Sequence, residues 1–214
     1  MWLSRLLRTI RWRIRGYQPG RFTPAEWNRQ YEQGQWRSLE DLSEVSHYSI
    51  ISGYCSYLGA ATILDVGCGQ GILAKMLKAQ PYRQYLGIDI SSEAIFEAQS
   101  RFGDGRTHFT ISDAKEFVPG ELFDVIIFNE CLYYLEEPDL LLLHYAQFLS
   151  PKGRMIVSIC DNLRTRLIWS LLRRVTTTDE TVTVINQTKS RWTIQILSPI
   201  GNEMSSRVFT PIQY

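Results

Sequence analysis

The sequence has little net charge and few cysteines. Its 23 Lys and Arg residues nearly balance 22 Asp and Glu residues, so the formal net charge is +1. Proteins that bind nucleic acid over their whole surface carry a strong basic excess, so no nucleic-acid partner is expected. The four cysteines form no C-x-x-C pair. That spacing argues against a zinc knuckle or a dense disulfide framework, and no metal site is predicted.

The sequence also lacks a long apolar run. No stretch reaches the ~18 apolar residues that a membrane-spanning helix requires. Residues 1–17 contain five arginines, which interrupt the apolar core that a secretory signal would need. These absences predict a cytoplasmic protein. The 214 residues are 44% hydrophobic and 21% charged, an average globular composition with enough length for one sizeable core.

From residue 62 onward, short apolar runs alternate with amphipathic stretches, the pattern of a parallel sheet with crossover helices. Strands are predicted over 62–66, 84–89, 107–111, 123–128 and 154–160, and helices over 71–79, 92–101, 138–149 and 162–175. Pro151 and Gly153 predict a tight turn before the fifth strand. Two further strand-like runs, 181–188 and 191–197, are separated by only Lys189 and Ser190. They predict a hairpin, which adds an antiparallel strand to the sheet.

Three segments are expected: a basic amphipathic helix over 1–21, a helical cap over 22–59, and a sheet domain over 60–214. One face of the first helix would hold Trp2, Leu3, Leu6, Leu7, Ile10 and Ile14, and the opposite face Arg5, Arg8, Arg11 and Arg15. This pattern is typical of a helix that lies on an anionic membrane. The alternative is a solvated basic face whose apolar stripe docks on the domain. A second basic amphipathic stretch, 163–175, would extend the same basic face.

The most informative segment, residues 63–73, has the sequence I-L-D-V-G-C-G-Q-G-I-L. A buried strand ends at Asp65, and Gly67, Gly69 and Gly71 then bend the chain into a helix. Glycines allow positive φ and close approach of a ligand, and the helix start offers unpaired N–H groups. The dinucleotide fingerprint G-x-G-x-x-G is absent, which argues against a nicotinamide cofactor. A carboxylate at Asp65 instead suits an ammonium group.

Two more acidic residues follow neighbouring strands. Asp89 ends the second predicted strand, where a carboxylate can accept both hydroxyl groups of a ribose. Asp113 follows the third strand, where it can accept a hydrogen bond from an exocyclic amine such as that of adenine. Plain helix capping is the alternative for both residues. Together, Asp65, Asp89 and Asp113 describe a site for an adenosine with a zwitterionic, sulfonium-bearing tail.

Over residues 60–199 the chain resembles the class I S-adenosylmethionine-dependent methyltransferases. Four motifs occur in the family's order: L-D-V-G-C-G-Q-G, G-I-D-I-S, F-D-V-I-I-F-N-E-C-L-Y-Y-L and L-S-P-K-G-R-M-I-V-S. The N-E-C-L-Y-Y-L run is similar to small-molecule N- and O-methyltransferases such as the nodulation N-methyltransferase. The resemblance implies a Rossmann-like, doubly wound α/β fold whose seven-stranded sheet is mostly parallel with an antiparallel C-terminal strand. It implies S-adenosylmethionine as cofactor, held by Asp65, Gly67, Cys68, Gly69, Gly71, Asp89, Ile90, Asp113, Ala114 and Asn129.

Candidates for a general base follow the fourth strand. Glu130, Tyr133 and Tyr134 lie just beyond its carboxyl end, and His47 in the cap is the next candidate. The alternative for the two tyrosines is packing over the cofactor. In the cap, Trp27, Tyr31 and Trp36 are expected either to close over the donor or to pack in a core.

The predicted function is methyl transfer from S-adenosylmethionine to a nitrogen or oxygen of a small, lipophilic or membrane-associated acceptor. Two alternatives stay open. An exocyclic-amine methyltransferase for nucleic acid would carry a polar-Pro-Pro-aromatic turn after the fourth strand, but residues 129–132 are N-E-C-L. A non-catalytic module that binds S-adenosylmethionine is also possible, because a fold and a cofactor site do not guarantee turnover.

Overall fold

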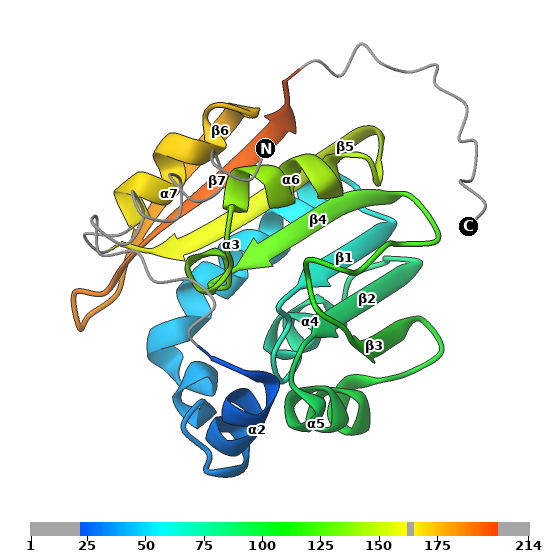
Figure 1. The fold of residues 1–214 in the computed structure, drawn as a ribbon, viewed down its shortest axis with the longest axis vertical. Coiled ribbons are helices and arrows are strands. Elements are labelled where there is room, and N and C mark those ends of the chain that lie inside the picture. Colours follow the sequence, from blue (N-terminus) through cyan, green and yellow to red (C-terminus); the bar gives the residue numbers. More distant parts are fainter. Residues whose placement is uncertain (1–21, 162–164, 201–214) are drawn as a thin grey trace, which may run out of the picture.

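The computed structural model describes residues 22–161 and 165–200, and its centre is a seven-stranded sheet (Figure 1). The strand order is β3-β2-β1-β4-β5-β7-β6. The strands are β1 (Thr62–Val66), β2 (Gln84–Asp89), β3 (Thr107–Ile111), β4 (Phe123–Asn129), β5 (Leu149–Cys160), β6 (Thr176–Ile185) and β7 (Arg191–Pro199). Strands β1 to β5 pair in parallel, whereas β7 runs antiparallel to both β5 and β6. This arrangement is the predicted fold class.

Helices cover both faces of the sheet, so its central strands are buried on both sides. The helical elements are α2 (Pro24–Glu32), η1 (Arg37–Glu40), α3 (Leu42–Tyr57), α4 (Ile72–Leu77), α5 (Ser92–Phe102), η2 (Leu132–Tyr134), α6 (Pro138–Ala146) and α7 (Thr165–Leu172). Alternate residues of one strand enter two different cores. In β4, Val125 and Ile127 pack in the core with α3, α4 and α5, while Ile126 and Phe128 pack with α6 and α7. Such continuous apolar runs are typical of buried parallel strands.

The strand order reverses between β1 and β4. From β1 the chain proceeds outward to β2 and β3, and it then returns to the other side of β1 as β4. The loops after β1 and β4 therefore diverge, which leaves a crevice at the carboxyl ends of these strands, where ligands bind in open α/β sheets. Asp65 in β1 and Asn129 at the end of β4 lie beside this crevice.

Several predicted boundaries differ from the structure. The turn expected at Pro151 and Gly153 lies within β5, where the β4–β5 register shifts between Phe123 and Val125, so an irregular strand accommodates both residues. The first hairpin strand begins at Thr176 rather than at residue 181. The hairpin loop spans residues 186–190, closed by a 3.1 Å bond from the Asn186 N–H to the Ser190 carbonyl, so the expected two-residue turn was wrong. Of the helix predicted over 162–175, residues 165–172 form α7.

Helices α2, η1 and α3 lie at the carboxyl-end side of the sheet and α3 continues along its face (Figure 1). A capping box begins α2, since the Thr23 hydroxyl accepts from the Glu26 N–H at 3.3 Å and the Glu26 carboxylate accepts from the Thr23 N–H at 2.6 Å. None of the helices in the described ranges is long and apolar enough to span a bilayer. Residues 1–21, where the basic amphipathic helix is expected, lie outside the described part of the chain.

Candidate functional site

The glycine loop between β1 and α4 uses left-handed backbone conformations. Gly67, Gly69 and Gly71 have φ values of +74°, +51° and +75°, which L-residues with side chains adopt at a cost. A Cβ atom at Gly67 would lie 2.7 Å from the Cβ atom of Cys131, and one at Gly69 would lie 2.9 Å from the hydroxyl of Tyr31. Gly67 and Gly69 therefore leave no room for a side chain at their positions in the loop.

Asp65 is the buried carboxylate beneath this loop. Its side chain is 2% exposed, and its Oδ2 atom accepts a 2.5 Å hydrogen bond from the Tyr85 hydroxyl. Its Oδ1 atom is buried and has no hydrogen-bond partner. Burial raises the pKa of Asp65 to about 7. An unpartnered buried carboxylate oxygen is costly, so a cationic or hydrogen-bond-donating ligand would stabilise this site.

Asp89 connects the end of β2 to the glycine loop. Its Oδ2 atom accepts from the Gly69 N–H at 3.0 Å, and its Oδ1 atom accepts from the Ser91 N–H at 2.9 Å. Burial raises the pKa of Asp89, although these backbone hydrogen bonds act in the opposite direction. Each oxygen keeps one lone pair, so the carboxylate can still accept two hydroxyl groups.

Asp113 and Ala114 follow β3 at the same edge of the sheet. The Oδ1 atom of Asp113 accepts from the Lys115 N–H at 2.8 Å, which is a local turn-stabilising bond. The carbonyl of Ala114 accepts from the Tyr145 hydroxyl at 2.9 Å, so α6 fixes this loop from behind. Asp113 thus caps its own turn, and its Oδ2 atom remains available to a ligand.

Glu130 comes immediately after β4 and has a strained backbone. Its φ of +56° is rare for a residue other than glycine, and such strain is concentrated at functional sites. Its Oε2 atom accepts a 3.1 Å hydrogen bond from the Tyr133 hydroxyl, whereas its buried Oε1 atom has no partner. Burial raises the pKa of Glu130 to about 8, which is near the range that suits a general base.

His47 is fully buried behind the crevice. Its Nδ1 atom lies 3.3 Å from Oδ1 of Asn129, and its ring stacks on the Trp192 ring with the two ring centroids 5.0 Å apart. Burial lowers the pKa of His47 to about 4, so the imidazole is neutral near pH 7. Its Nε2 atom lies 3.4 Å from the Glu44 carboxylate, but a neutral ring makes no ion pair there. His47 therefore contacts the side chain of Asn129 but does not itself line the cavity.

A cavity of about 520 Å³ joins these residues, and its size is in the range of small-molecule sites. Twelve of the fourteen predicted site residues line it: Asp65, Gly67, Cys68, Gly69, Asp89, Ile90, Asp113, Ala114, Asn129, Glu130, Tyr133 and Tyr134. The other two, His47 and Gly71, do not. Gly71 instead begins α4, where a Cβ atom would lie 3.0 Å from the Phe109 ring. Over residues 22–161 and 165–200, no three His, Cys, Asp or Glu side chains are grouped to hold a metal ion.

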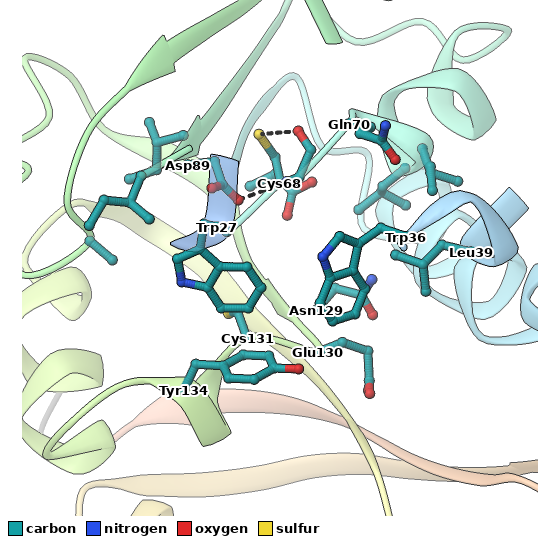
Figure 2. Close-up of a pocket in the computed structure, with 18 of the residues that line it drawn as sticks. Trp27, Trp36, Leu39, Cys68, Gln70, Asp89, Asn129, Glu130, Cys131 and Tyr134 are labelled. Atoms are coloured by element: carbon teal, nitrogen blue, oxygen red, sulfur yellow. Dashed lines mark hydrogen bonds between the residues drawn. The ribbon is translucent and has the colours of Figure 1, made fainter. Parts of the chain in front are cut away.

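Aromatic side chains of the cap form one wall of the cavity. Trp27 contacts Trp36, Tyr31 and Tyr134, with ring centroids 5.7, 6.4 and 4.9 Å apart respectively. In the view of Figure 2, the two indoles stand between Asp89 at one end of the pocket and Glu130 with Tyr134 at the other. The cap aromatics therefore line the site rather than packing only in a separate core.

Asn28 fastens the cap to the sheet domain. Its Oδ1 atom accepts from the Ser91 hydroxyl at 2.8 Å, and its Nδ2 group donates to the Ser92 hydroxyl at 2.9 Å. Ser91 is also the N-cap of α5, because its hydroxyl accepts from the Ala94 N–H. One helix start thus holds both α5 and the cap helix α2 over the cavity.

Sequence reasoning missed several residues of the cavity wall. Glu44 and Tyr48 come from α3, and Cys160, Ser190 and Trp192 come from β5 and the hairpin. No local motif marks them, because the hairpin reaches the site only through the pairing of β7 with β5. Glu44 had the one usable signal, an acidic residue three positions before the predicted His47.

A family model for a methyltransferase domain matches residues 11–186 of the sequence. The chain belongs to this family. Its members use S-adenosylmethionine, so the predicted family, enzyme class and cofactor are confirmed. The match spans the cap, the glycine loop and β1 to β6, so this methyltransferase domain includes every element that lines the cavity except β7 and the hairpin loop beyond residue 186.

Curated relatives of this methyltransferase are distant. It is 32% identical over 98 residues to a malonyl-[acyl-carrier protein] O-methyltransferase of Anoxybacillus flavithermus, which covers 45% of this chain and 38% of that enzyme. It is 28% identical over 150 residues to an uncharacterized methyltransferase of Mycobacterium tuberculosis, covering 68% and 72% of the two chains. The chain thus spans less than half of the first relative and about seven-tenths of the second.

Solved methyltransferases share the fold. The N-methyltransferase NodS from Bradyrhizobium japonicum, in complex with S-adenosylhomocysteine, has a TM-score of 0.66 at 21% identity, covering 77% of this chain and 91% of NodS. A 1,6-didemethyltoxoflavin N1-methyltransferase from Burkholderia thailandensis also has a TM-score of 0.66, at 18% identity, covering 81% and 85%. These likenesses confirm the Rossmann-like sheet with its antiparallel C-terminal strand.

Proposed function

We propose that this methyltransferase transfers the methyl group of S-adenosylmethionine to a nitrogen or oxygen of a small, lipophilic acceptor. The observation that carries the proposal is the single cavity that joins the glycine loop and Asp89 to Glu130 and the aromatic cap. Such continuity lets a donor and an acceptor meet in one cavity, where alignment alone can supply effective molarities of ~10⁵ M or more.

The residues at the β1–β2–β3 end fit the cofactor. In this proposal the unpartnered Oδ1 atom of Asp65 accepts from the amino group of the methionine moiety, and the Gly67–Gly69 backbone, with Cys68, lies against that moiety. Asp89 accepts the ribose hydroxyl groups beside Ile90. Asp113 and Ala114 contact the adenine edge, and Asn129 flanks the reacting methyl group, whereas Gly71 supports the loop from α4.

The bound cofactor supplies an electrophilic methyl group. At the acceptor end, we assign Glu130 as the group that receives a proton from the acceptor, because its carboxylate has a free buried oxygen and a raised pKa. Tyr133 orients this carboxylate through its 3.1 Å hydrogen bond, and Tyr134 packs against Trp27 to exclude water. His47 acts through Asn129, whose side chain it holds.

A labelling experiment tests the function. The protein is incubated with methyl-labelled S-adenosylmethionine and cell extract, and the product is separated into lipid, small polar, protein and nucleic-acid pools. We expect label in the lipid or small polar pool, and much less label with Asp89→Ala, which lacks the carboxylate proposed for ribose. Nuclease-sensitive label would favour the nucleic-acid alternative. Tight cofactor binding without label in any pool would favour a non-catalytic module.

We also propose the three-segment organisation, with residues 22–59 as a cap on the 60–214 domain and residues 1–21 as a helix on an anionic membrane surface. The alternation of apolar residues with five arginines in residues 1–17 supports the membrane contact. Deleting residues 1–16 should abolish pelleting with anionic liposomes and leave cofactor affinity unchanged. Full-length protein that never pellets with such liposomes would contradict the membrane proposal.

A further inference from the structure

The cavity holds more carboxylates than its cofactor end uses. Asp65, Asp89 and Asp113 belong to the loops assigned to the cofactor, and Glu44 and Glu130 remain at the other end. Among the described lining residues, the one Lys or Arg is Lys115. Its Nζ atom lies 2.9 Å from the Glu136 carboxylate, beside the adenine-side loop. The acceptor end therefore holds two carboxyl groups, and none of the described lining residues pairs a basic side chain with them.

Glu44 and Glu130 line the same cavity and are linked through His47. The Nε2 atom of His47 lies 3.4 Å from the Glu44 carboxylate, and its Nδ1 atom lies 3.3 Å from Oδ1 of Asn129, the residue before Glu130. The Oε1 atom of Glu130 is buried without a partner, and the residue lines the cavity. A buried acceptor of this kind is satisfied when a ligand donates a hydrogen bond to it. A cation beside it would also favour the ionised carboxylate.

Aromatic and apolar side chains also line this end. Trp27, Trp36, Leu39 and Tyr134 belong to the cavity wall, and Figure 2 shows Glu130 near the Trp36 indole and the Tyr134 ring, with Leu39 beside Trp36. Indole faces attract cations and also provide apolar contact area for a hydrophobic body. The Nε1 atom of Trp36 is buried without a partner, which offers one hydrogen-bond donor to an oxygen of the ligand.

Given the proposed methyltransferase function, we propose that the acceptor is a primary or secondary amine on an aromatic or apolar body. It binds as an ammonium ion between Glu130 and Glu44. One N–H bond breaks and its proton passes to the Glu130 carboxylate. The nitrogen lone pair then forms the new N–C bond, and the electron pair of the broken C–S bond stays on sulfur, which leaves as a neutral thioether. The methylated product keeps one positive charge, so charge is conserved.

Three probes of nearly equal shape test the charge requirement. 2-Phenylethylamine, 2-phenylethanol and phenylacetate share a phenyl ring and differ in the charge of the head group. Binding is measured by calorimetry with the full-length protein saturated with S-adenosylhomocysteine. The amine should bind at least tenfold more tightly than the alcohol, because its positive charge favours the ionised form of the two glutamates. Phenylacetate should bind most weakly, because its negative charge opposes that ionisation. With labelled S-adenosylmethionine, the amine should receive the methyl group.

Substitutions at the two glutamates test which side chains cause the preference for amine over alcohol. Glu130→Gln and Glu44→Gln should each reduce the preference for amine over alcohol by about tenfold, whereas the exposed control Glu116→Gln should leave it unchanged. Equal affinities, tighter binding of phenylacetate, or no detectable amine binding at millimolar concentration would overturn the amine proposal. Failure of S-adenosylhomocysteine itself to bind would instead remove the proposed function, so the two failures are distinguishable.

Discussion

The backbone N–H of Gly69 donates a 3.0 Å hydrogen bond to the Oδ2 atom of Asp89. This bond ties the glycine loop after β1 to the end of β2, so the shape of the loop depends on the carboxylate assigned to ribose. Asp89 thus has two roles, one in loop geometry and one proposed in ligand binding. A substitution at Asp89 should affect both, and the choice of replacement can separate them.

Replacing Asp89 with Asn keeps one acceptor oxygen for the Gly69 N–H but removes the charge. We expect Asp89→Asn to weaken binding of S-adenosylhomocysteine by roughly 1.5–3 kcal/mol, because charge-assisted hydrogen bonds to ribose are lost. Asp89→Ala should weaken binding further and also lower the melting temperature, since two backbone N–H groups lose their acceptor. Calorimetry measures the affinity, with Glu116→Gln as the control. Unchanged affinity in Asp89→Asn would contradict the ribose assignment.

Gly69 and Gly59 have similar backbone angles but different surroundings. Alanine substitutions at these two positions therefore separate the cost of backbone strain from steric blocking of the ligand. Gly69 and Gly59 have φ values of +51° and +62°, but an added Cβ atom meets the Tyr31 hydroxyl at Gly69 and nothing within 4 Å at Gly59. Alanine at either position should cost roughly 1–2 kcal/mol of folding free energy, measured by urea unfolding. Only Gly69→Ala should also weaken cofactor binding, by tenfold or more. Equal cofactor affinity in both variants would contradict the role of Gly69 as a ligand contact.

Asp65 should make stability depend on pH. Its folded pKa of about 7 is above its ordinary value of 3.8, so the folded state keeps a proton that the unfolded chain has released between these values. Stability contributed by this residue therefore falls as the pH rises through that window. Asp65→Asn removes the free-energy cost of ionising this buried carboxyl group. The variant should therefore be more stable than the wild type in its cofactor-free form at about pH 8, by roughly 2–4 kcal/mol.

The advantage of Asp65→Asn should shrink as the pH is lowered to about 5, where the native carboxyl group is already protonated. Urea unfolding at both pH values measures this difference. The same variant should bind S-adenosylhomocysteine more weakly, because a neutral amide replaces the partner of its amino group. A wild-type protein as stable as the variant at high pH would show that Asp65 is not destabilising in the free protein.

Asn28 should control how quickly the cofactor leaves. Asn28→Ala removes the hydrogen bonds to Ser91 and Ser92 that hold α2 over the cavity, while Ser91 still caps α5. Loss of these bonds should cost roughly 1–2 kcal/mol of cap closure, which corresponds to about a tenfold faster release of S-adenosylhomocysteine. Stopped-flow measurement of tryptophan fluorescence follows the release through Trp27 and Trp36. The Arg29→Ala variant, which is changed on the exposed side of α2, should release S-adenosylhomocysteine at the wild-type rate. Equal release rates in both variants would show that the Asn28 hydrogen bonds do not control cofactor release.

The sequence alone was sufficient to predict features whose residues are close together in the chain. The bend at Gly67, Gly69 and Gly71 and the acidic ends of β1 and β2 could be placed because strand, turn and helix patterns are local properties. The same holds for β1, β2 and β3, whose predicted bounds agree with the structure. Twelve predicted residues meet in one cavity because parallel strands bring their carboxyl ends to one edge of the sheet.

Only the tertiary structure decided what lies opposite those strand ends. His47 lies behind Asn129, and Gly71 packs on Phe109. Glu44 and Trp192 line the cavity. No local sequence motif predicts these placements. The β6 boundary and the hairpin loop also follow from pairing with β7, whose position is fixed by β5. Burial and register depend on contacts between residues far apart in the chain, so they, and the acidic, aromatic character of the acceptor end, emerge only when the sheet and cap are assembled.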